Sequence, residues 1–118
     1  MIFTWMVALA SPVMACGYCV EDKIAAVYDY ASVTRAAAQK HTVAYFAIDG
    51  MIRDPASSLK TMIERTRGVE KGSARISVEA RAVAVSFDPR RTPLTAIQSA
   101  LEKALKPRGL TLLLLDTK

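Results

Sequence analysis

The amino-acid sequence predicts an α+β protein in which a domain of order βαββαβ follows an extra N-terminal helix. Stretches of β-branched, aromatic or alternating apolar residues are interleaved with segments whose apolar residues recur every three or four positions. Gly and Pro residues separate these segments. The chain has 118 residues, of which 52% are hydrophobic, so it is long enough to build one ordinary core.

Residues 20–40 are expected to form one long helix, because they contain no Gly or Pro and are rich in alanine. Glu21 and Asp22 fall in the first turn, where the positive end of the helix dipole favours acids, and Lys40 falls in the last. The expected apolar stripe consists of Val20, Ile24, Val27, Ala31, Thr34 and Ala38.

The first half of the βαββαβ domain begins with a strand over residues 42–49, which are rich in β-branched and aromatic residues and precede Gly50. Asp54 is the expected N-cap of the next helix, with Pro55 at its first helical position. We expect this helix to run to about Thr66 and to end at Gly68.

The second half begins with a strand in which apolar residues alternate between positions 74 and 78. A tight turn over residues 79–81 leads to a third strand over residues 82–87. The pair Thr92-Pro93 predicts the start of a helix that extends to about Lys106. Residues 110–115, a leucine-rich run after Gly109, are expected to form the last strand.

This order of elements is that of a ferredoxin-like antiparallel sandwich, preceded here by an N-terminal helix. The first strand is apolar on both faces, and the last strand is an unbroken leucine run. Strands of this kind predict a sheet that is covered on both faces. The helix over residues 20–40 is one expected cover, and a second subunit that docks on the open sheet face as a homodimer is the other.

Residues 1–15 carry no charge and are too few to cross a bilayer as a helix. They resemble a signal peptide, with an apolar run, a Ser-Pro break and the small residue Ala15 at the expected cleavage site. We therefore predict a periplasmic or otherwise exported protein whose first mature residue is Cys16. The segment lacks the usual positive start, so a buried strand over residues 2–9 is the alternative. A membrane association is expected only if Cys16 is lipidated.

Cys16 and Cys19 are the two cysteines of the chain and form a C-x-x-C motif at the start of the predicted helix. Two thiols at this spacing can close a disulfide or hold one soft metal ion. In an oxidising compartment a disulfide at rest is expected. The motif is therefore compatible with metal binding, thiol–disulfide exchange or a structural bridge. Residues 1–15, 16–40 and 41–118 form the three expected segments of the chain.

The net charge of +5 arises beyond His41, because acids and bases balance up to Lys40. The basic residues are scattered, and no aromatic-rich nucleic-acid motif accompanies them. We read this charge as a solvated surface and expect no nucleic-acid partner. His41 is the single histidine, so no catalytic triad can be built around it, and the chain offers no constellation typical of an enzyme. We interpret His41 as a surface residue at a helix end.

Residues 42–115 resemble the heavy-metal-associated (HMA) domain of copper chaperones and metal-transporting ATPases. The resemblance rests on Gly50-Met51 after the first strand, Gly68-Val69 after the first helix and the stretch AVAVSFDP at residues 82–89. It implies a ferredoxin-like fold, an inward-packed Met and a Cu(I) site in a C-x-x-C directly after Gly-Met. Arg53 and Ala56 stand here where the family has its two thiols.

The motif Cys-Gly-Tyr-Cys also resembles the active site of periplasmic thioredoxin-fold disulfide isomerases, a likeness that ends beyond Asp49. Our interpretation is an exported HMA-like protein that handles a soft metal such as Cu(I) through Cys16 and Cys19, with a metal donor or acceptor protein as partner. The alternatives are a thiol–disulfide redox partner and a non-catalytic protein-binding module with a structural disulfide.

Overall fold

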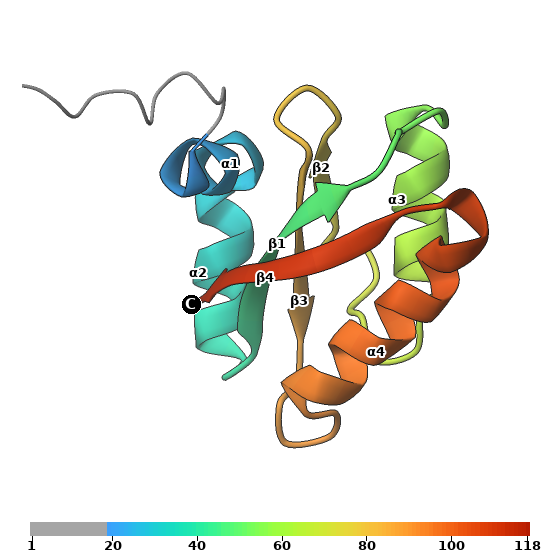
Figure 1. Ribbon diagram of the computed structural model, residues 1–118. Helices are drawn as coiled ribbons and strands as arrows, with labels where there is room; N and C mark the ends of the chain where they lie inside the picture. Colours follow the sequence, from blue (N-terminus) through green and yellow to red (C-terminus); the bar gives the residue numbers. More distant parts are fainter. Residues whose placement is uncertain (1–18) are drawn as a thin grey trace, which may run out of the picture.

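The computed structural model describes residues 19–118. The expected export signal over residues 1–15 and the first thiol, Cys16, lie outside the described residues. The described part forms helices α1 and α2, then a four-stranded sheet with helices α3 and α4 between its strands (Figure 1). No helix within residues 19–118 combines the length and the apolar character that a membrane span requires.

The sheet is antiparallel throughout and has the strand order β2-β3-β1-β4. Its strands are β1 (Thr42–Asp49), β2 (Arg75–Ser77), β3 (Ala82–Phe87) and β4 (Thr111–Thr117). β1 and β3 are the central strands; every residue of β3 is buried, and so are five of the eight residues of β1. This order and the intervening helices confirm the predicted ferredoxin-like α+β fold.

The main core lies between one face of the sheet and helices α3 (Ala56–Glu64) and α4 (Leu94–Leu105), and a short 3₁₀ helix, η2 (Lys106–Arg108), follows α4. Each helix turns its apolar positions towards the strands, as its periodicity predicts. The largest side chains that this core buries completely are Phe46, Leu59, Ile63, Phe87, Ile97, Leu101, Leu105 and Leu110.

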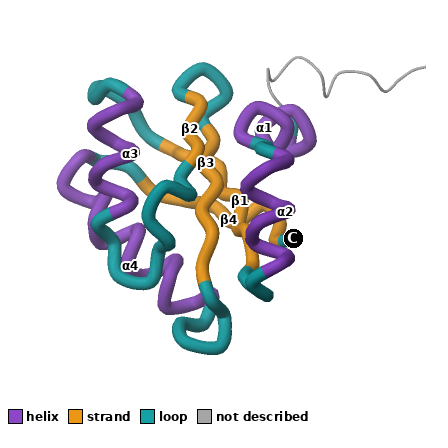
Figure 2. Tube along the Cα trace, turned by 180° about the vertical axis from the view of Figure 1, so that it is seen from behind, coloured by secondary structure: helices purple, strands orange, loops and turns teal. Residues whose placement is uncertain are grey.

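A second, smaller core lies on the opposite face of the sheet, beneath α1 (Val20–Val27) and α2 (Tyr30–Ala38). Figure 2 shows α1 and α2 on one side of the strands and α3 and α4 on the other. The buried members of this second core are Val27, Ala36, Val43, Tyr45, Ala80, Ala82 and Ala84. The predicted two-sided burial is therefore correct, and the chain supplies the second cover from its own N-terminal segment.

The single helix expected over residues 20–40 is wrong, because the segment breaks between α1 and α2. Asp29 has an extended backbone at the break and caps α2, accepting a hydrogen bond from the Ala31 amide at 3.2 Å. Its carboxylate also accepts hydrogen bonds from the Ser32 hydroxyl at 2.8 Å and from Arg75 of β2 at 2.8 Å. These contacts, Ser32 first, hold the pKa of Asp29 below its usual value.

The helix starts and strand ends also differ from the sequence expectations. Pro55 and Pro93 stand at the N-cap positions of α3 and α4, and neither cap has a side-chain hydrogen bond. Asp54, the expected N-cap, instead pairs with Arg108 at 3.5 Å. β2 is limited to three residues, and β4 runs from Thr111 to Thr117, because pairing with β1 extends it beyond the leucine run.

Candidate metal centre and its surroundings

The loop between β1 and α3 turns at Gly50, in a backbone conformation that favours glycine. Its φ of +113° is one that side chains with a Cβ rarely adopt. A Cβ at this position would lie 2.4 Å from the carbonyl oxygen of Gly109, so the loop approaches the end of η2 at backbone distance. Arg81, from the β2–β3 turn, donates a hydrogen bond to the Gly50 carbonyl.

This loop offers no thiol or imidazole for a soft metal. Arg53 and Ala56, which replace the two thiols of the HMA pattern, are both exposed. Met51 is 67% exposed, so the expectation that it packs inward is wrong. Within residues 19–118, no group of three or more His, Cys, Asp or Glu side chains is arranged to hold a metal ion. Any metal centre of this chain would therefore need ligands from outside this loop.

Cys19 is the only predicted metal ligand among the described residues. It occupies the N-cap position of α1, with an extended backbone, and its half-buried thiol has no disulfide partner within residues 19–118. Glu21 and Asp22 follow it in the first turn, and both side chains are exposed. Cys16 lies outside the described residues, so the pairing of the two sulfur atoms, in a disulfide or around a metal, stays a prediction.

The start of α1 lies on the other side of the sheet from the β1–α3 loop (Figure 1). α1 contacts the strands from the second core, and the Lys23 ammonium holds it there by donating to the Ala80 carbonyl at 2.7 Å. Cys19 therefore does not take the place of the missing thiols in the loop. A metal centre built on Cys19 would be a separate site with a different approach from solvent.

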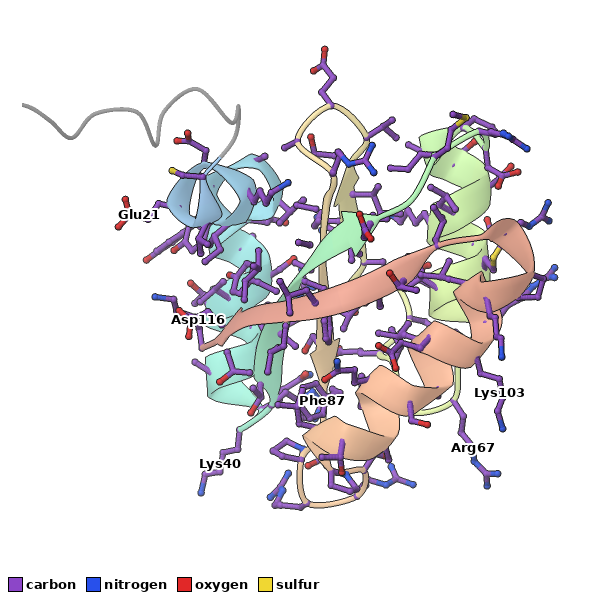
Figure 3. All side chains as sticks on the ribbon, viewed as in Figure 1. Glu21, Lys40, Arg67, Phe87, Lys103 and Asp116 are labelled. Atoms are coloured by element: carbon purple, nitrogen blue, oxygen red, sulfur yellow. The ribbon has the colours of Figure 1, made fainter. Side chains whose placement is uncertain are left out.

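His41 lies in a polar cluster at the opposite end of the N-terminal helices from Cys19. Figure 3 labels Glu21 and Lys40 at the two ends of this segment. The Nδ1 atom of His41 is 3.0 Å from Glu70 Oε1, and its Nε2 atom is 3.9 Å from Asp88 Oδ2. The predicted position at a helix end is correct, although the imidazole is half-buried and bonded to the domain rather than free in solvent.

The partners of His41 are part of a network that sequence reasoning missed. The Ser86 hydroxyl donates to Glu70 Oε1 at 3.0 Å, although 16 positions separate the two residues. Hydrogen bonds from Arg90, and the nearby His41, hold the pKa of Asp88 below its usual value. The network ties the start of β1 to the end of β3. The contacts of its members within residues 19–118 do not include Cys19.

Tyr45 carries the one buried side-chain polar atom within residues 19–118 that has no hydrogen-bond partner. Its ring belongs to the second core, and only 1% of the residue is exposed. Burial, followed by the nearby Tyr28 and Asp116, raises the pKa of its phenol above 10.0. The alternating pattern of β1 is enough to place this ring on one face of the sheet. The lack of a hydrogen-bond partner for its hydroxyl depends on the tertiary structure.

Comparison with known proteins begins with two negative results: no family model matches the chain, and no curated protein matches its sequence. Solved structures do match. The N-terminal domain of a potential copper-translocating P-type ATPase from Bacillus subtilis, in the Cu(I)-loaded state, superposes with a TM-score of 0.51 at 22% identity. The match covers 66% of this chain and 91% of that domain.

Two further structures superpose equally well. A copper binding domain from HMA7, a P-type ATPase, gives a TM-score of 0.52 at 20% identity and covers 65% of this chain and 97% of its own. Oxidized MerP from Ralstonia metallidurans CH34 gives a TM-score of 0.51 at 22% identity and covers 64% of this chain and 99% of its own.

The chain contains an HMA-like fold. The matches cover 91%, 97% and 99% of these three domains and about two thirds of this chain. Sequence identities of 20–22% support a shared fold only. The functional site has to be argued from this chain's own residues. The HMA-like domain, as we call the part from β1 to β4, thus confirms the fold that the sequence resemblance implies.

Proposed function

We propose that this chain is an exported protein that handles a soft metal ion, with Cu(I) as the first choice, through Cys16 and Cys19. The proposal is supported by the fold, because two of the structures that superpose on it are copper-binding domains by their own descriptions. The alternatives of a redox partner and a binding module differ from it in what the two sulfur atoms do. The experiments below separate them.

One observation carries the choice of site: the loop that follows β1 has Arg53 and Ala56 where two thiols would be needed. The guanidinium of Arg53 would repel a cation, and a methyl group offers no ligand. Cu(I) prefers soft thiolate ligands, and the two cysteines are the strongest such donors in the sequence. The half-buried thiol of Cys19 at the start of α1 is suited to this role.

The partner that fits this function is a protein that donates or accepts the metal. A two-thiolate centre leaves Cu(I) open to a third ligand from such a partner, so that the ion can pass between proteins without being released. On this proposal the HMA-like domain serves as the scaffold, and the N-terminal segment carries the chemistry. Lipidation of Cys16 would remove one ligand and attach the chain to a membrane instead.

The test is Cu(I) binding by the reduced full-length protein in competition with a chromophoric Cu(I) chelator. We expect about one Cu(I) per chain, because two thiolates can hold one soft ion. Cys19→Ser should abolish this binding, whereas Met51→Leu, which removes an exposed soft donor from the β1–α3 loop, should leave it unchanged. The intact mass of protein from its native host serves as the control for cleavage before Cys16 and for lipidation.

Binding that survives Cys19→Ser would contradict the proposal, and so would a reduced protein that takes up no Cu(I). A reduction potential of the Cys16–Cys19 pair that matches the poise of its compartment, without metal binding, would favour the redox partner. A potential far below that poise would indicate a static bridge and a protein-binding module.

A further inference from the structure

We infer that the outer side of the HMA-like domain binds an acidic polypeptide segment in a groove between α3 and α4. This α3–α4 groove lies on the side of these helices that faces away from the sheet. The lining residues on which the inference depends are Thr61, Arg65, Arg67, Ser99, Lys103 and Arg108.

The groove exists because both helices present short side chains to each other on their outer sides. Leu59, Ile97 and Leu101 point to the sheet and are buried in the main core, where they fix the two helices. Above them the facing positions are mostly Ala, Ser and Thr, which are too short to close the space between the helices. The result is a concave surface that a polypeptide segment can enter.

The groove is positively charged and contains no acid. Arg65, Arg67, Lys103 and Arg108 line it, and all four are exposed. Figure 3 shows Arg67 and Lys103 extending from the same side of the molecule. Within residues 19–118, three of these cations have no ion pair, and only Arg108 has one, with Asp54 at 3.5 Å.

The acid of α3 is turned away from the groove. Glu64 accepts a hydrogen bond from the Ala74 amide at 3.1 Å and lies 3.9 Å from the Lys60 ammonium. Glu64 therefore does not pair with the groove cations, which can pair with carboxylates of an external partner. Arranged along a concave surface, they match a row of carboxylates on one segment of chain.

The concave shape selects a polypeptide over a membrane. A flat bilayer surface would leave the concave, hydroxyl-lined space between the two helices unfilled. A segment of chain can lie in this space, next to Thr61 and Ser99, while its carboxylates reach the cations that line it. The scattered basic residues of the sequence are thus partly gathered by the fold on one side of the domain.

This inference goes beyond the proposed metal function and is independent of it, because the groove and α1 lie on opposite sides of the sheet (Figure 2). Failure of metal binding would leave the groove intact. Cys19→Ser, which should abolish Cu(I) binding, should therefore leave peptide binding unchanged.

The experiment measures binding of a fluorescein-labelled Glu/Ala peptide to the full chain by fluorescence anisotropy at low salt. The double variant Arg67→Gln with Lys103→Gln should weaken binding about tenfold or more, because it removes two charges that contact the peptide. The matched variant Lys71→Gln with Arg91→Gln removes the same charge from exposed positions outside the groove, and it should weaken binding about twofold or less.

A Gln/Ala peptide of the same length should not bind, and added salt should weaken binding of the Glu/Ala peptide steeply. Equal losses in the two double variants would overturn the inference, because net charge alone would then explain the binding. Binding of phosphatidylglycerol vesicles with the same dependence on Arg67 and Lys103, without peptide binding, would also overturn it. Unchanged urea midpoints confirm that the variants fold, and the single variant Arg65→Gln, which shares no substitution with the double variant, gives an independent second test.

Discussion

The side chain of Tyr45 makes opposite contributions to the stability of the fold through its ring and its hydroxyl. The ring stabilises the second core through burial, but its oxygen loses hydrogen bonds to water and gains none within residues 19–118. An unsatisfied buried hydroxyl costs about 1–3 kcal/mol. The cost is offset by the large apolar area of the aromatic ring.

Replacing Tyr45 by Phe should therefore raise the free energy of unfolding by about 1 kcal/mol, because the ring remains and the unpaired oxygen is removed. Urea unfolding measures this directly. A clear loss of stability would contradict the prediction, since it would mean that the hydroxyl makes a hydrogen bond in solution.

The same variant should change the alkaline stability of the protein. The folded state raises the pKa of Tyr45 above 10.0, so near that pH the unfolded chain releases the proton while the folded chain retains it. Stability that is present below pH 10 is consequently lost as the pH rises through and beyond this value. The urea midpoint of Tyr45→Phe should fall less steeply than that of the wild type over the same range.

Among the elements, the β1–α3 loop carries the Gly-Met pair of the HMA pattern but offers no thiol. Gly50 has a positive φ at the start of the loop, and an ion pair between Asp54 and Arg108 joins the loop to η2. The residues that would bind metal are changed, but the glycine that shapes the loop is present. The loop thus keeps a structural role, which a pair of glycine substitutions can test.

Gly50→Ala should destabilise the protein by about 3 kcal/mol, because strain at positive φ adds to the overlap of the new Cβ with the Gly109 carbonyl. Gly72→Ala is the matched control. Gly72 has a φ of +82°, but a Cβ there would meet nothing within 4 Å, so this variant should lose only about 1 kcal/mol of stability, from the added backbone strain. Equal urea midpoints for the two variants would refute the close approach of Gly50 to η2.

At the scale of the whole molecule, the sheet has a helical layer on each face, and the two layers come from different parts of the chain. α3 and α4 are intrinsic to the HMA-like domain, whereas α1 and α2 precede it in sequence. The second layer covers Val43, Tyr45, Ala82 and Ala84, which would otherwise face water. The N-terminal segment is therefore both the carrier of Cys19 and a part of the folded core.

A shortened chain that begins at His41 should consequently expose an apolar sheet face. We expect it to self-associate in size-exclusion chromatography and to unfold at a lower urea concentration than the full chain. A chain that begins at Cys19 keeps both helices and serves as the control. If the two shortened chains had the same size and the same urea midpoint, α1 and α2 would not be part of the core.

The sequence alone determined the order of elements, the range of β1 and the two-sided burial of the sheet, because these depend on apolar periodicity and on Gly and Pro positions. It also showed that Arg53 and Ala56 stand in place of thiols. Tertiary structure decided the break at Asp29, since Arg75 lies 46 positions away and stabilises the cap from β2. It likewise decided the partners of His41, the unpaired Tyr45 hydroxyl and the gathering of cations in the α3–α4 groove. Each of these depends on contacts between residues that only folding brings together, and local patterns carry no record of such contacts.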